Sequence, residues 1–428
     1  MIPDFAINAY FVYHSLLILI NFFYRIIILC NFAVGLQICI ILLFNMINRK
    51  LDCVIKENLT YFPVVTVTGP RQSGKTTLIR AMFPNMAYYS LENPNTRAMA
   101  MDDPVAFLTQ HSEGMVLDEV QNVPSLLSYL QGIVDEHKDR RYILSGSSQF
   151  SLQSSITQSL AGRTAVLELL PISVQEMQGN PATDDADLLM YSGFYPAVVA
   201  GDNIPRMFYP AYVRTYLERD VRGLLQVKDL YQFQTFLRLC AGRVGSLFNA
   251  SELSGEVGVS VNTIRSWLSI LQASYIVFLV HPYFENSRKR LTKTPKLYFH
   301  DTGLACYLLG IESPQQLSSD RMRGHLFENM IVADIVKRST NEGRTPELMF
   351  YRDSNGNEID LLIAKGQSIE SYEIKSSSTY NSSFETAFRN LTSQLEARLT
   401  RRAIVYNGTQ ERIGAPIEVL RYTSLLSV

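Results

Sequence analysis

The sequence predicts an α/β protein whose first folded domain is a three-layer sandwich, with helices on both faces of a parallel sheet. Between residues 46 and 178, short apolar runs alternate with segments of helical periodicity, which is the pattern of a parallel sheet joined by crossover helices. A glycine-rich segment directly follows the apolar run 64–68, and a pair of acids directly follows the run 115–117. Both segments begin where a predicted strand ends, which is where open α/β sheets carry their binding sites.

The glycine-rich segment fits the phosphate-loop pattern G-x-x-x-x-G-K-[ST] and follows a strand, as this pattern requires. Glycines allow the backbone to turn so tightly that successive N–H groups point at phosphate oxygens, and the next helix adds the positive end of its dipole. The segment predicts a P-loop NTPase fold, with ATP and Mg²⁺ as the expected cofactors. The residues expected around the nucleotide are Gly69, Pro70, Arg71, Gln72, Ser73, Gly74, Lys75, Thr76, Thr77 and Asp118.

Charge assigns a role to each side chain at this site. Lys75 is expected to reach the β- and γ-phosphates, while the Thr76 hydroxyl and Asp118 are expected to hold Mg²⁺. Glu119, the second acid of the pair, would orient the attacking water. By itself, an apolar run that ends in two acids is more often a strand that meets solvent. Its position downstream of the phosphate loop favours the catalytic interpretation.

Two further features complete the predicted catalytic set. The strand-like segment 141–147 ends in hydroxyl groups, so that Ser145 or Ser147 would sense the γ-phosphate, unless the segment is an ordinary turn. Arg163 is the candidate cation for the charge on the transferring phosphoryl group, in its own chain or in a neighbouring one. The alternative is a solvated arginine that follows a helix C-cap glycine. The weaker candidates for this cation are Arg71 and Arg219.

These motifs together resemble the prokaryotic AAA-type ATP-binding proteins that carry a C-terminal domain of unknown function. The resemblance extends from about Met46 to the C-terminus and implies an AAA-like ATPase core, a winged-helix segment and a nuclease-like end. The apolar N-terminus departs from the family pattern, which begins near Met46. The segments that carry the resemblance are the phosphate loop and residues 117–121, 144–147, 160–163 and 170–173.

A polar, turn-rich break at residues 179–185 marks the end of the first domain. After the ATPase core we expect a helical and winged-helix segment and then a small α/β nuclease-like domain. The predicted parts are an apolar N-terminal segment (1–45), the ATPase core (46–178), a linker and helical segment (179–241), a winged-helix domain (242–310) and the nuclease-like domain (311–428).

The winged-helix prediction rests on the segment 249–271, which is typical of helix, turn and helix, with Ser260 as the cap of the second helix. Strands over 275–280 and 296–300 would form a wing whose cations contact a phosphate backbone. The second helix carries few polar side chains, so a protein partner is the alternative to nucleic acid. The cations of the predicted wing are Arg288, Lys289, Arg290 and Lys293.

Four residues near the C-terminus fit the pattern of PD-(D/E)xK nucleases. Glu373 and Lys375 lie two positions apart in a strand-like run, so their side chains share one face. Asp360, at the start of the preceding strand, and Glu328 further upstream would share a metal ion with Glu373, while Lys375 stabilises attacking water or the scissile phosphate. A retained fold with a silent site is the alternative.

The first 45 residues carry almost no charge, and the uncharged stretch 26–44 would form a helix about 28 Å long, close to the thickness of a bilayer core. Arg49 and Lys50 would then hold the following end in the cytoplasm. The alternative is that Met46 is the true start. The protein is expected to be cytoplasmic, and membrane-anchored only if this segment is genuine.

The net charge and the cysteine positions argue against a strongly basic nucleic-acid-binding protein, a disulfide-rich protein and a zinc-cluster protein. The net charge of −1 provides no global basic field, so contact with nucleic acid has to be local. The 5 cysteines lie far apart without a C-x-x-C pair, which fits neither a disulfide framework nor a zinc cluster.

The leading interpretation is an ATPase that uses ATP binding and hydrolysis to reposition its winged-helix and nuclease-like domains on a nucleic-acid or protein partner. Two alternatives belong to other classes: a metal-dependent nuclease gated by ATP, and a nucleotide-switched adaptor that binds protein. An oligomer is compatible with each, because Arg163 could act on a neighbouring copy.

Overall fold

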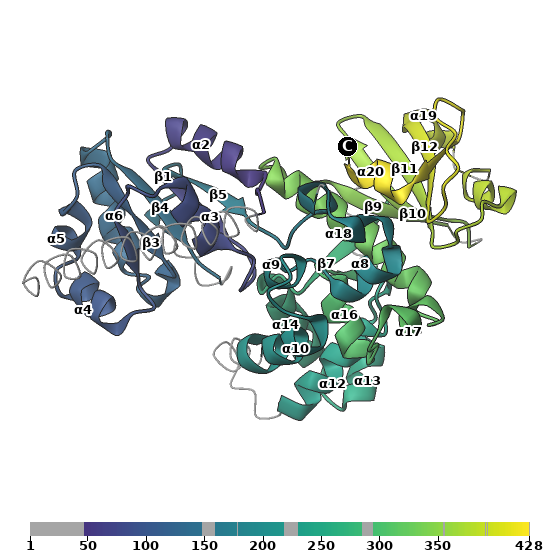
Figure 1. Cartoon of the computed structure of the whole chain (residues 1–428), viewed down its shortest axis with the longest axis horizontal. Helices are drawn as coiled ribbons and strands as arrows, with labels where there is room; N and C mark the ends of the chain where they lie inside the picture. Colours follow the sequence, from purple (N-terminus) through teal and green to yellow (C-terminus); the bar gives the residue numbers. More distant parts are fainter. Residues whose placement is uncertain are drawn as a thin grey trace, which may run out of the picture. The chain divides into compact units, whose positions relative to one another are not determined.

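Five parallel strands form the first sheet in the order β2-β3-β4-β1-β5, which confirms the predicted α/β sandwich (Figure 1). The strands are β1 (Val64–Thr68), β2 (Tyr88–Ser90), β3 (Gly114–Asp118), β4 (Arg141–Ser145) and β5 (Thr164–Glu168).

This computed structural model describes residues 47–147, 159–177, 179–217, 230–284, 294–353, 356–389, 391 and 393–427. The predicted span 26–44 lies outside these residues. Among the described residues, no helix is long and apolar enough to cross a membrane.

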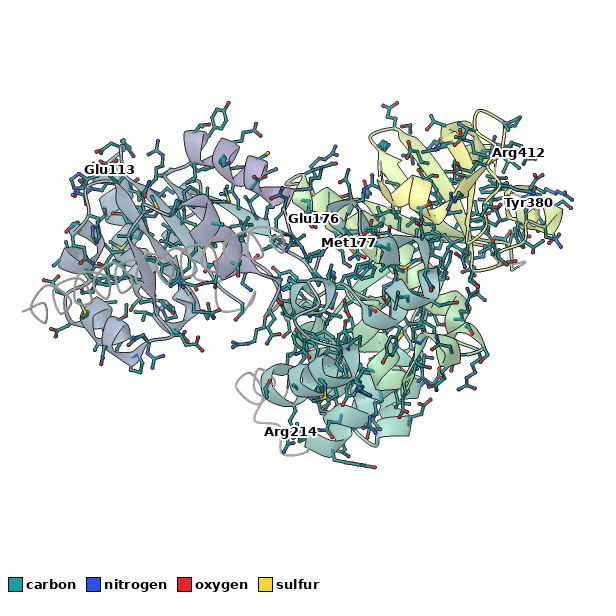
Figure 2. All side chains as sticks on the ribbon, viewed as in Figure 1. Glu113, Glu176, Met177, Arg214, Tyr380 and Arg412 are labelled. Carbon is teal, nitrogen blue, oxygen red and sulfur yellow. The ribbon has the colours of Figure 1, made fainter. Side chains whose placement is uncertain are left out.

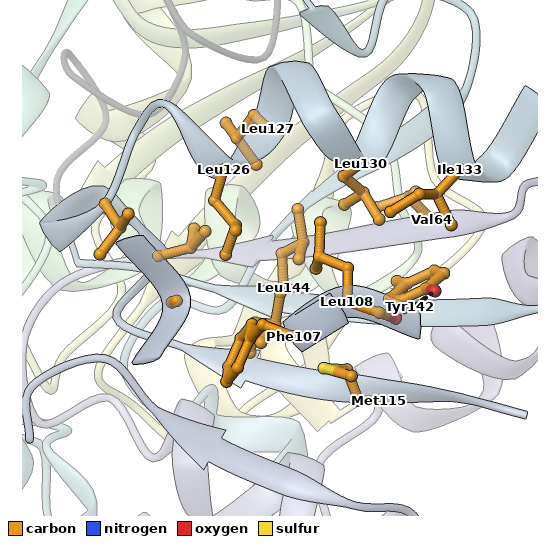
Figure 3. Close-up of a cluster of buried hydrophobic side chains, with 14 of the residues drawn as sticks. Val64, Phe107, Leu108, Met115, Leu126, Leu127, Leu130, Ile133, Tyr142 and Leu144 are labelled. Atoms are coloured by element: carbon orange, nitrogen blue, oxygen red, sulfur yellow. Dashed lines mark hydrogen bonds between the residues drawn. The ribbon is translucent and has the colours of Figure 1, made fainter. Parts of the chain in front are cut away.

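Helices cover both faces of this sheet, and side chains point to the two faces in turn along each strand. On one face Val65 and Val67 pack against α2 (Leu51–Tyr61) and α3 (Lys75–Met82). On the other face Val64, Tyr142 and Leu144 pack against α5 (Pro104–Thr109) and α6 (Leu126–Glu136), as Figure 3 shows. A short helix, α4 (Pro94–Asp102), precedes α5.

The strand order decides where the functional segments meet. β4 lies between β1 and β3, and all three strands run in the same direction. The segments that follow these strands therefore leave the same edge of the sheet side by side. They are the phosphate loop after β1, Ser145 to Ser147 at the end of β4, and the acid pair Asp118-Glu119 at the end of β3.

Short helices follow the first sheet. The two helices predicted between 249 and 271 are present as α13 (Ala250–Val257) and α14 (Val261–Ala273). Gly258 ends α13 with a positive φ, and Ser260 Oγ accepts a hydrogen bond from the backbone N–H of Thr263. The other helical elements are η2 (Val174–Met177), η3 (Pro181–Asp184), α8 (Ala186–Ser192), α9 (Pro196–Val199), α10 (Pro205–Tyr212), η4 (Val213–Leu217) and α12 (Leu230–Ala241).

A second sheet of eight strands, in the order β13-β12-β11-β10-β9-β7-β8-β6, crosses the boundary predicted at residue 310. Its strands are β6 (Ser246–Leu247), β7 (Val277–Pro282), β8 (Lys296–Phe299), β9 (Leu348–Arg352), β10 (Glu358–Lys365), β11 (Ser368–Lys375), β12 (Leu399–Tyr406) and β13 (Glu418–Arg421). β7 pairs antiparallel with β8 and parallel with β9, so the two regions share backbone hydrogen bonds. The predicted wing cations Arg288, Lys289, Arg290 and Lys293 lie outside the described residues.

One long helix, α18 (Arg323–Asn341), packs against this sheet and carries buried polar side chains. Asn329 shows how they are satisfied: its amide accepts a hydrogen bond from the N–H of Phe299 and donates one to the carbonyl of the same residue. The helix is thereby fixed in register against β8. The remaining helical elements are α16 (Thr302–Leu309), α17 (Pro314–Ser318), η5 (Ser382–Phe388), α19 (Ser393–Arg398) and α20 (Tyr422–Ser427).

We expect His300 to make folding stability depend on pH. Its ring is buried beside Phe278, with ring centroids 4.7 Å apart, and burial together with the charge of Lys337 lowers its pKa to about 3. The unfolded chain binds a proton at this histidine below about pH 6.5, whereas the folded chain does not. The free energy of unfolding should therefore fall on acidification, by up to about 1.4 kcal/mol per pH unit from this group.

Urea denaturation of the wild type and His300→Phe between pH 7 and pH 5 measures this contribution. The difference between the two proteins isolates the histidine from acids that titrate in the same range. Stability curves with the same slope in both proteins would contradict the expected role of His300.

Candidate functional site

The phosphate loop begins where β1 ends, and its first glycine is required by the space there. Gly69 has a φ of 142°, and a Cβ atom at this position would lie 2.2 Å from the carbonyl oxygen of Leu169. Gly74, with a φ of 92°, directly precedes α3. Both angles favour glycine. Of the other predicted loop residues, Pro70, Arg71, Gln72 and Ser73 connect the two glycines, and Thr76 and Thr77 lie in the first turn of α3.

Lys75 is buried inside this loop. Its Nζ donates hydrogen bonds to the carbonyl oxygens of Gly69 and Pro70 at 3.0 and 2.8 Å. An ammonium group is a point cation whose hydrogen bonds can be redirected to an incoming phosphate oxygen. The loop and its lysine are therefore arranged to bind an anion.

Three hydroxyl groups converge on the buried carboxylate of Asp118. Thr76 and Tyr88 donate to its Oδ2 at 2.8 and 2.5 Å, and Ser145 donates to its Oδ1. The structure thus brings together three of the residues predicted from the strand ends. Hydroxyl and carboxylate oxygens are the ligands that Mg²⁺ prefers, so Thr76 and Asp118 fit the predicted ion.

Glu119 has a backbone conformation that is unusual for its residue type. Its φ of 56° lies in the left-handed region, which costs a non-glycine residue about 1–3 kcal/mol. The carboxylate Oε2 accepts hydrogen bonds from Ser147 Oγ at 3.2 Å and from the amide of Gln121. The turn therefore directs the Glu119 carboxylate toward the end of β4. The sequence analysis assigned no role to its second partner, Gln121.

Tyr88 is a second residue that the sequence did not single out. It lies on β2, opposite Val116 of β3, and reaches the same carboxylate as Thr76. The guanidinium of Arg80 lies over its ring, 3.9 Å from the centroid. Burial and the neighbouring Asp118 raise the pKa of Tyr88, so its hydroxyl stays a donor. A local sequence pattern does not show which strands pair in a sheet, so it could not place Tyr88 beside Asp118.

Arg163, for which the sequence leaves open a role in its own chain or in a neighbouring one, lies away from this site within its own chain. It precedes β5, and its carbonyl accepts a hydrogen bond from Val64 N at the start of β1. At about 3.3 Å per residue, the five residues of β5 separate it from the phosphate loop by roughly 16 Å. Its guanidinium instead forms an ion pair with Asp135 at 2.8 Å. Arg71 lies in the loop, and Arg219 lies outside the described residues.

Arg49 is buried against the phosphate loop, whereas the sequence interpretation placed it beside a membrane. It donates to the carbonyl oxygens of Ser73 and Leu170 and forms an ion pair with Glu176 at 3.0 Å. A charged group with three fixed partners inside the protein is not available to a lipid headgroup. Arg49 therefore cannot be part of the positive flank that was predicted to follow residues 26–44.

The four residues of the predicted nuclease site come together beside α18. Lys375 and Glu373 on β11 form an ion pair, and Lys375 Nζ lies 3.7 Å from Asp360 Oδ2 on β10. Glu328 on α18 faces the same group of charges. Burial and the charge of Asp360 raise the pKa of Glu328 and of Glu373 to about 7 each.

Lys296 on β8 is an unpredicted member of this cluster. Its Nζ lies 3.2 Å from Glu328, 2.6 Å from Glu358 and 4.0 Å from Asp360. Two lysines are thus ion-paired with the acids that were expected to hold a metal. In the part of the chain that the structure describes, no three side chains of the metal-binding types are placed to hold an ion.

Three family descriptions match consecutive parts of this chain. Residues 61–178 match the AAA domain, residues 183–315 match a domain of unknown function (DUF8612), and residues 323–425 match a domain of unknown function (DUF4143). The AAA match contains the phosphate loop and the acid pair.

Two solved structures are similar over part of the chain. The Walker-type ATPase PABY2304 of Pyrococcus abyssi has a TM-score of 0.45 and 14 % identity, covering 61 % of this chain and 96 % of that one. AMPPCP-bound DnaA from Aquifex aeolicus has a TM-score of 0.25 and 11 % identity, covering 51 % of this chain and 86 % of that one.

Curated relatives match most of the chain. The uncharacterized protein Rv2008c of Mycobacterium tuberculosis is 31 % identical over 366 residues, which cover 84 % of this chain and 80 % of the relative. The uncharacterized protein MJ1544 of Methanocaldococcus jannaschii is 22 % identical and covers 74 % of this chain and 75 % of the relative. With this identity to the mycobacterial protein, and with the phosphate loop inside an AAA domain, the chain belongs to that protein's family, the AAA-type ATPases that carry a DUF4143 domain at the C-terminal end.

Proposed function

We propose that the protein is a Mg²⁺-dependent ATPase that uses ATP binding and hydrolysis to reposition its winged-helix domain (242–310, the middle domain) and its nuclease-like domain (311–428, the C-terminal domain) on a macromolecular partner. The observation that carries the proposal is the meeting of Lys75, Asp118 and Glu119 at one edge of the sheet, beside the N-terminus of α3. A cation, a metal-binding pair and a water-orienting acid are the parts that phosphoryl transfer to water requires.

Each side chain of the site has a separate task in this proposal. Lys75 and the loop N–H groups bind and neutralise the phosphate oxygens. Thr76 and Asp118 would hold Mg²⁺, which neutralises charge on the nucleotide. Glu119 accepts a hydrogen bond from the attacking water and takes its proton, a task for which Ser147 orients the carboxylate. Burial of Asp118 among hydroxyl donors fixes the geometry before the nucleotide binds.

The middle domain supplies the surface that we propose for the partner. Along the chain the elements are α12, β6, α13, α14, β7 and β8, which is the order that a winged helix requires, and β8 pairs antiparallel with both β6 and β7. This arrangement supports the winged-helix prediction. Nucleic acid and protein partners both fit this arrangement. A neighbouring copy in an oligomer would be needed for Arg163 to act as the catalytic cation.

A metal-dependent nuclease gated by ATP is supported less well. The charge cluster of Glu328, Asp360, Glu373 and Lys375 is assembled, but Lys296 lies among its acids as an internal counter-ion. As arranged, the described side chains of this cluster do not fit a metal ion. The cluster instead holds α18, β8, β10 and β11 together by ion pairs.

We expect substitutions at the nucleotide site to separate binding from turnover. Lys75→Ala removes a charge-assisted contact to phosphate and should weaken ATP binding roughly 10- to 100-fold. Glu119→Gln keeps the shape of the site but cannot accept a proton, so ATP should bind normally while turnover falls about 10²- to 10⁴-fold. Fluorescent-nucleotide titration and phosphate release measure the two effects.

Glu113→Gln is the matched control for Glu119→Gln. Glu113 is exposed and precedes β3, at the opposite edge of the sheet from the phosphate loop (Figure 2). Unchanged turnover in Glu119→Gln, or an equal loss in both variants, would refute the role of Glu119.

We also expect Tyr88→Phe to weaken activation by Mg²⁺. The substitution removes one of the hydroxyl groups that orient Asp118, and losing such an outer contact of a metal ligand typically costs about 10-fold or more in metal affinity. The Mg²⁺ concentration for half-maximal ATP turnover should rise accordingly. Tyr89→Phe is the control, because the neighbouring hydroxyl contacts His111 instead. The same Mg²⁺ dependence in both variants would count against Tyr88.

The nuclease alternative is tested directly with supercoiled plasmid, ATP and either Mg²⁺ or Mn²⁺. Because two lysines are paired with the acids of the cluster, we expect no nicking above background by the wild type. Lys375→Ala identifies contaminating activity, which it would leave unchanged. Cleavage by the wild type that Lys375→Ala abolishes would replace our interpretation with the nuclease.

A further inference from the structure

The two ends of the phosphate loop are held by side chains from outside the strands and helices that form the site. Thr68 is the last residue of β1 and directly precedes Gly69, while Ser73 directly precedes Gly74. Each end contacts one long side chain, Tyr275 at the first and Arg49 at the second. Neither residue belongs to the sequence motifs that predict nucleotide binding.

Tyr275 comes from the joint between α14 and β7 in the middle domain. Its hydroxyl shares a hydrogen bond of 2.8 Å with Thr68 Oγ1 and donates to Glu168 Oε1 at 3.3 Å. The residue is 3 % exposed and has a φ of 56°. A bulky residue keeps such a backbone conformation only where surrounding contacts impose it. The strained turn therefore places the hydroxyl at the base of the phosphate loop.

Arg49 holds the other end through its guanidinium group. One NH₂ group donates to the carbonyl of Ser73 and the other to the carbonyl of Leu170, both at 2.7 Å, while Nε donates to Glu176 at 3.0 Å. Burial alone would raise the pKa of Glu176, but the charge of Arg49 and hydrogen bonds from Ser173 and Lys50 hold it below its usual value. The carboxylate of Glu176 is therefore ionised at neutral pH.

The segment that carries Glu176 is itself fixed by α18 of the C-terminal domain. Asp334 accepts a hydrogen bond from Val174 N at 2.7 Å, and Lys337 Nζ donates to the carbonyl of Ile172 at 3.3 Å. Glu176 is labelled in Figure 2. A continuous series of contacts thus connects α18, this segment, Arg49 and the phosphate loop.

We propose that Tyr275 and Arg49 are positioning residues that hold the two ends of the phosphate loop against the region formed by the second sheet and α18, so that a movement of this region relative to the first sheet regulates nucleotide affinity. The inference rests on the proposed ATPase function and identifies the regulation of that site. Because such coupling is reciprocal, nucleotide binding changes the contacts of Tyr275 and Arg49 as strongly as these contacts change nucleotide binding.

The first experiment compares ATP affinity in Tyr275→Phe and Arg49→Lys with the wild type. Tyr275→Phe removes one hydroxyl and should raise the Kd for ATP about 2- to 10-fold, and Arg49→Lys, which loses the forked contact, about 10-fold or more. Tyr142→Phe and Arg141→Lys are the controls, because their side chains bond to backbone carbonyls away from the loop. Urea denaturation reports the loss of stability in all four variants.

A purely structural role would lower stability in variants and controls alike and leave every Kd unchanged, and that result overturns the inference. Tyr275→Phe decides the question by itself if Arg49→Lys does not fold. A wild type that binds no ATP would overturn the proposed function, whereas a wild type that binds ATP with the same Kd as both variants overturns this inference alone.

The second experiment reads the reciprocal effect by hydrogen exchange of the wild type with and without ATP. We expect ATP to slow amide exchange at residues 274–276 and 172–174, and we expect Tyr275→Phe to reduce the effect at the first segment only. Lys75→Ala shows whether the change requires nucleotide at the loop. Exchange at both segments that does not respond to bound ATP would contradict the coupling.

Discussion

The position of β1 between two parallel neighbours is the constraint on which the nucleotide site depends. β4 and β5 pair with β1 along its length, so the phosphate loop must leave the sheet beside the end of β4 and against Leu169 after β5. The carbonyl of Leu169 leaves no space for a side chain at Gly69. A strand order in which β1 lay further from β3 than one intervening strand would place Asp118 beyond the reach of Thr76.

The rule for parallel sheets explains which site residues the sequence could predict. Asp118 and Ser145 are the last residues of their strands and the loop follows β1, and the carboxyl ends of parallel strands share one edge. Arg163 precedes its strand, and the same rule places it at the opposite edge. Tyr88 and Tyr275 were beyond such reasoning, because their partners depend on strand pairing or on contacts between domains. Tyr275 and Thr68, for example, are 207 positions apart.

The C-terminal cluster shows a different limit of sequence reasoning. The two-residue spacing of Glu373 and Lys375 correctly places both side chains on one face of β11. Nothing in that spacing indicates Lys296, which reaches the acids from a strand that was expected to form part of a wing. Charge balance inside a domain is set by every element that packs there. A motif therefore predicts which acids meet but not which cations compensate them.

Buried charge also determines what kind of motion can connect the nucleotide to the C-terminal domain. Removing one partner of a buried ion pair such as Arg49 and Glu176 costs about 3–5 kcal/mol, because the other charge stays buried without compensation. If the segment that carries Glu176 slid past Arg49, this ion pair would have to break. The segment between Ile172 and Glu176 is therefore expected to move with α18 as one unit, so that a displacement of the helix reaches Ser73 through the guanidinium of Arg49. A small change at the phosphate loop can then bias the position of a whole helix, because interfaces fixed by directional bonds favour discrete arrangements over continuous deformation.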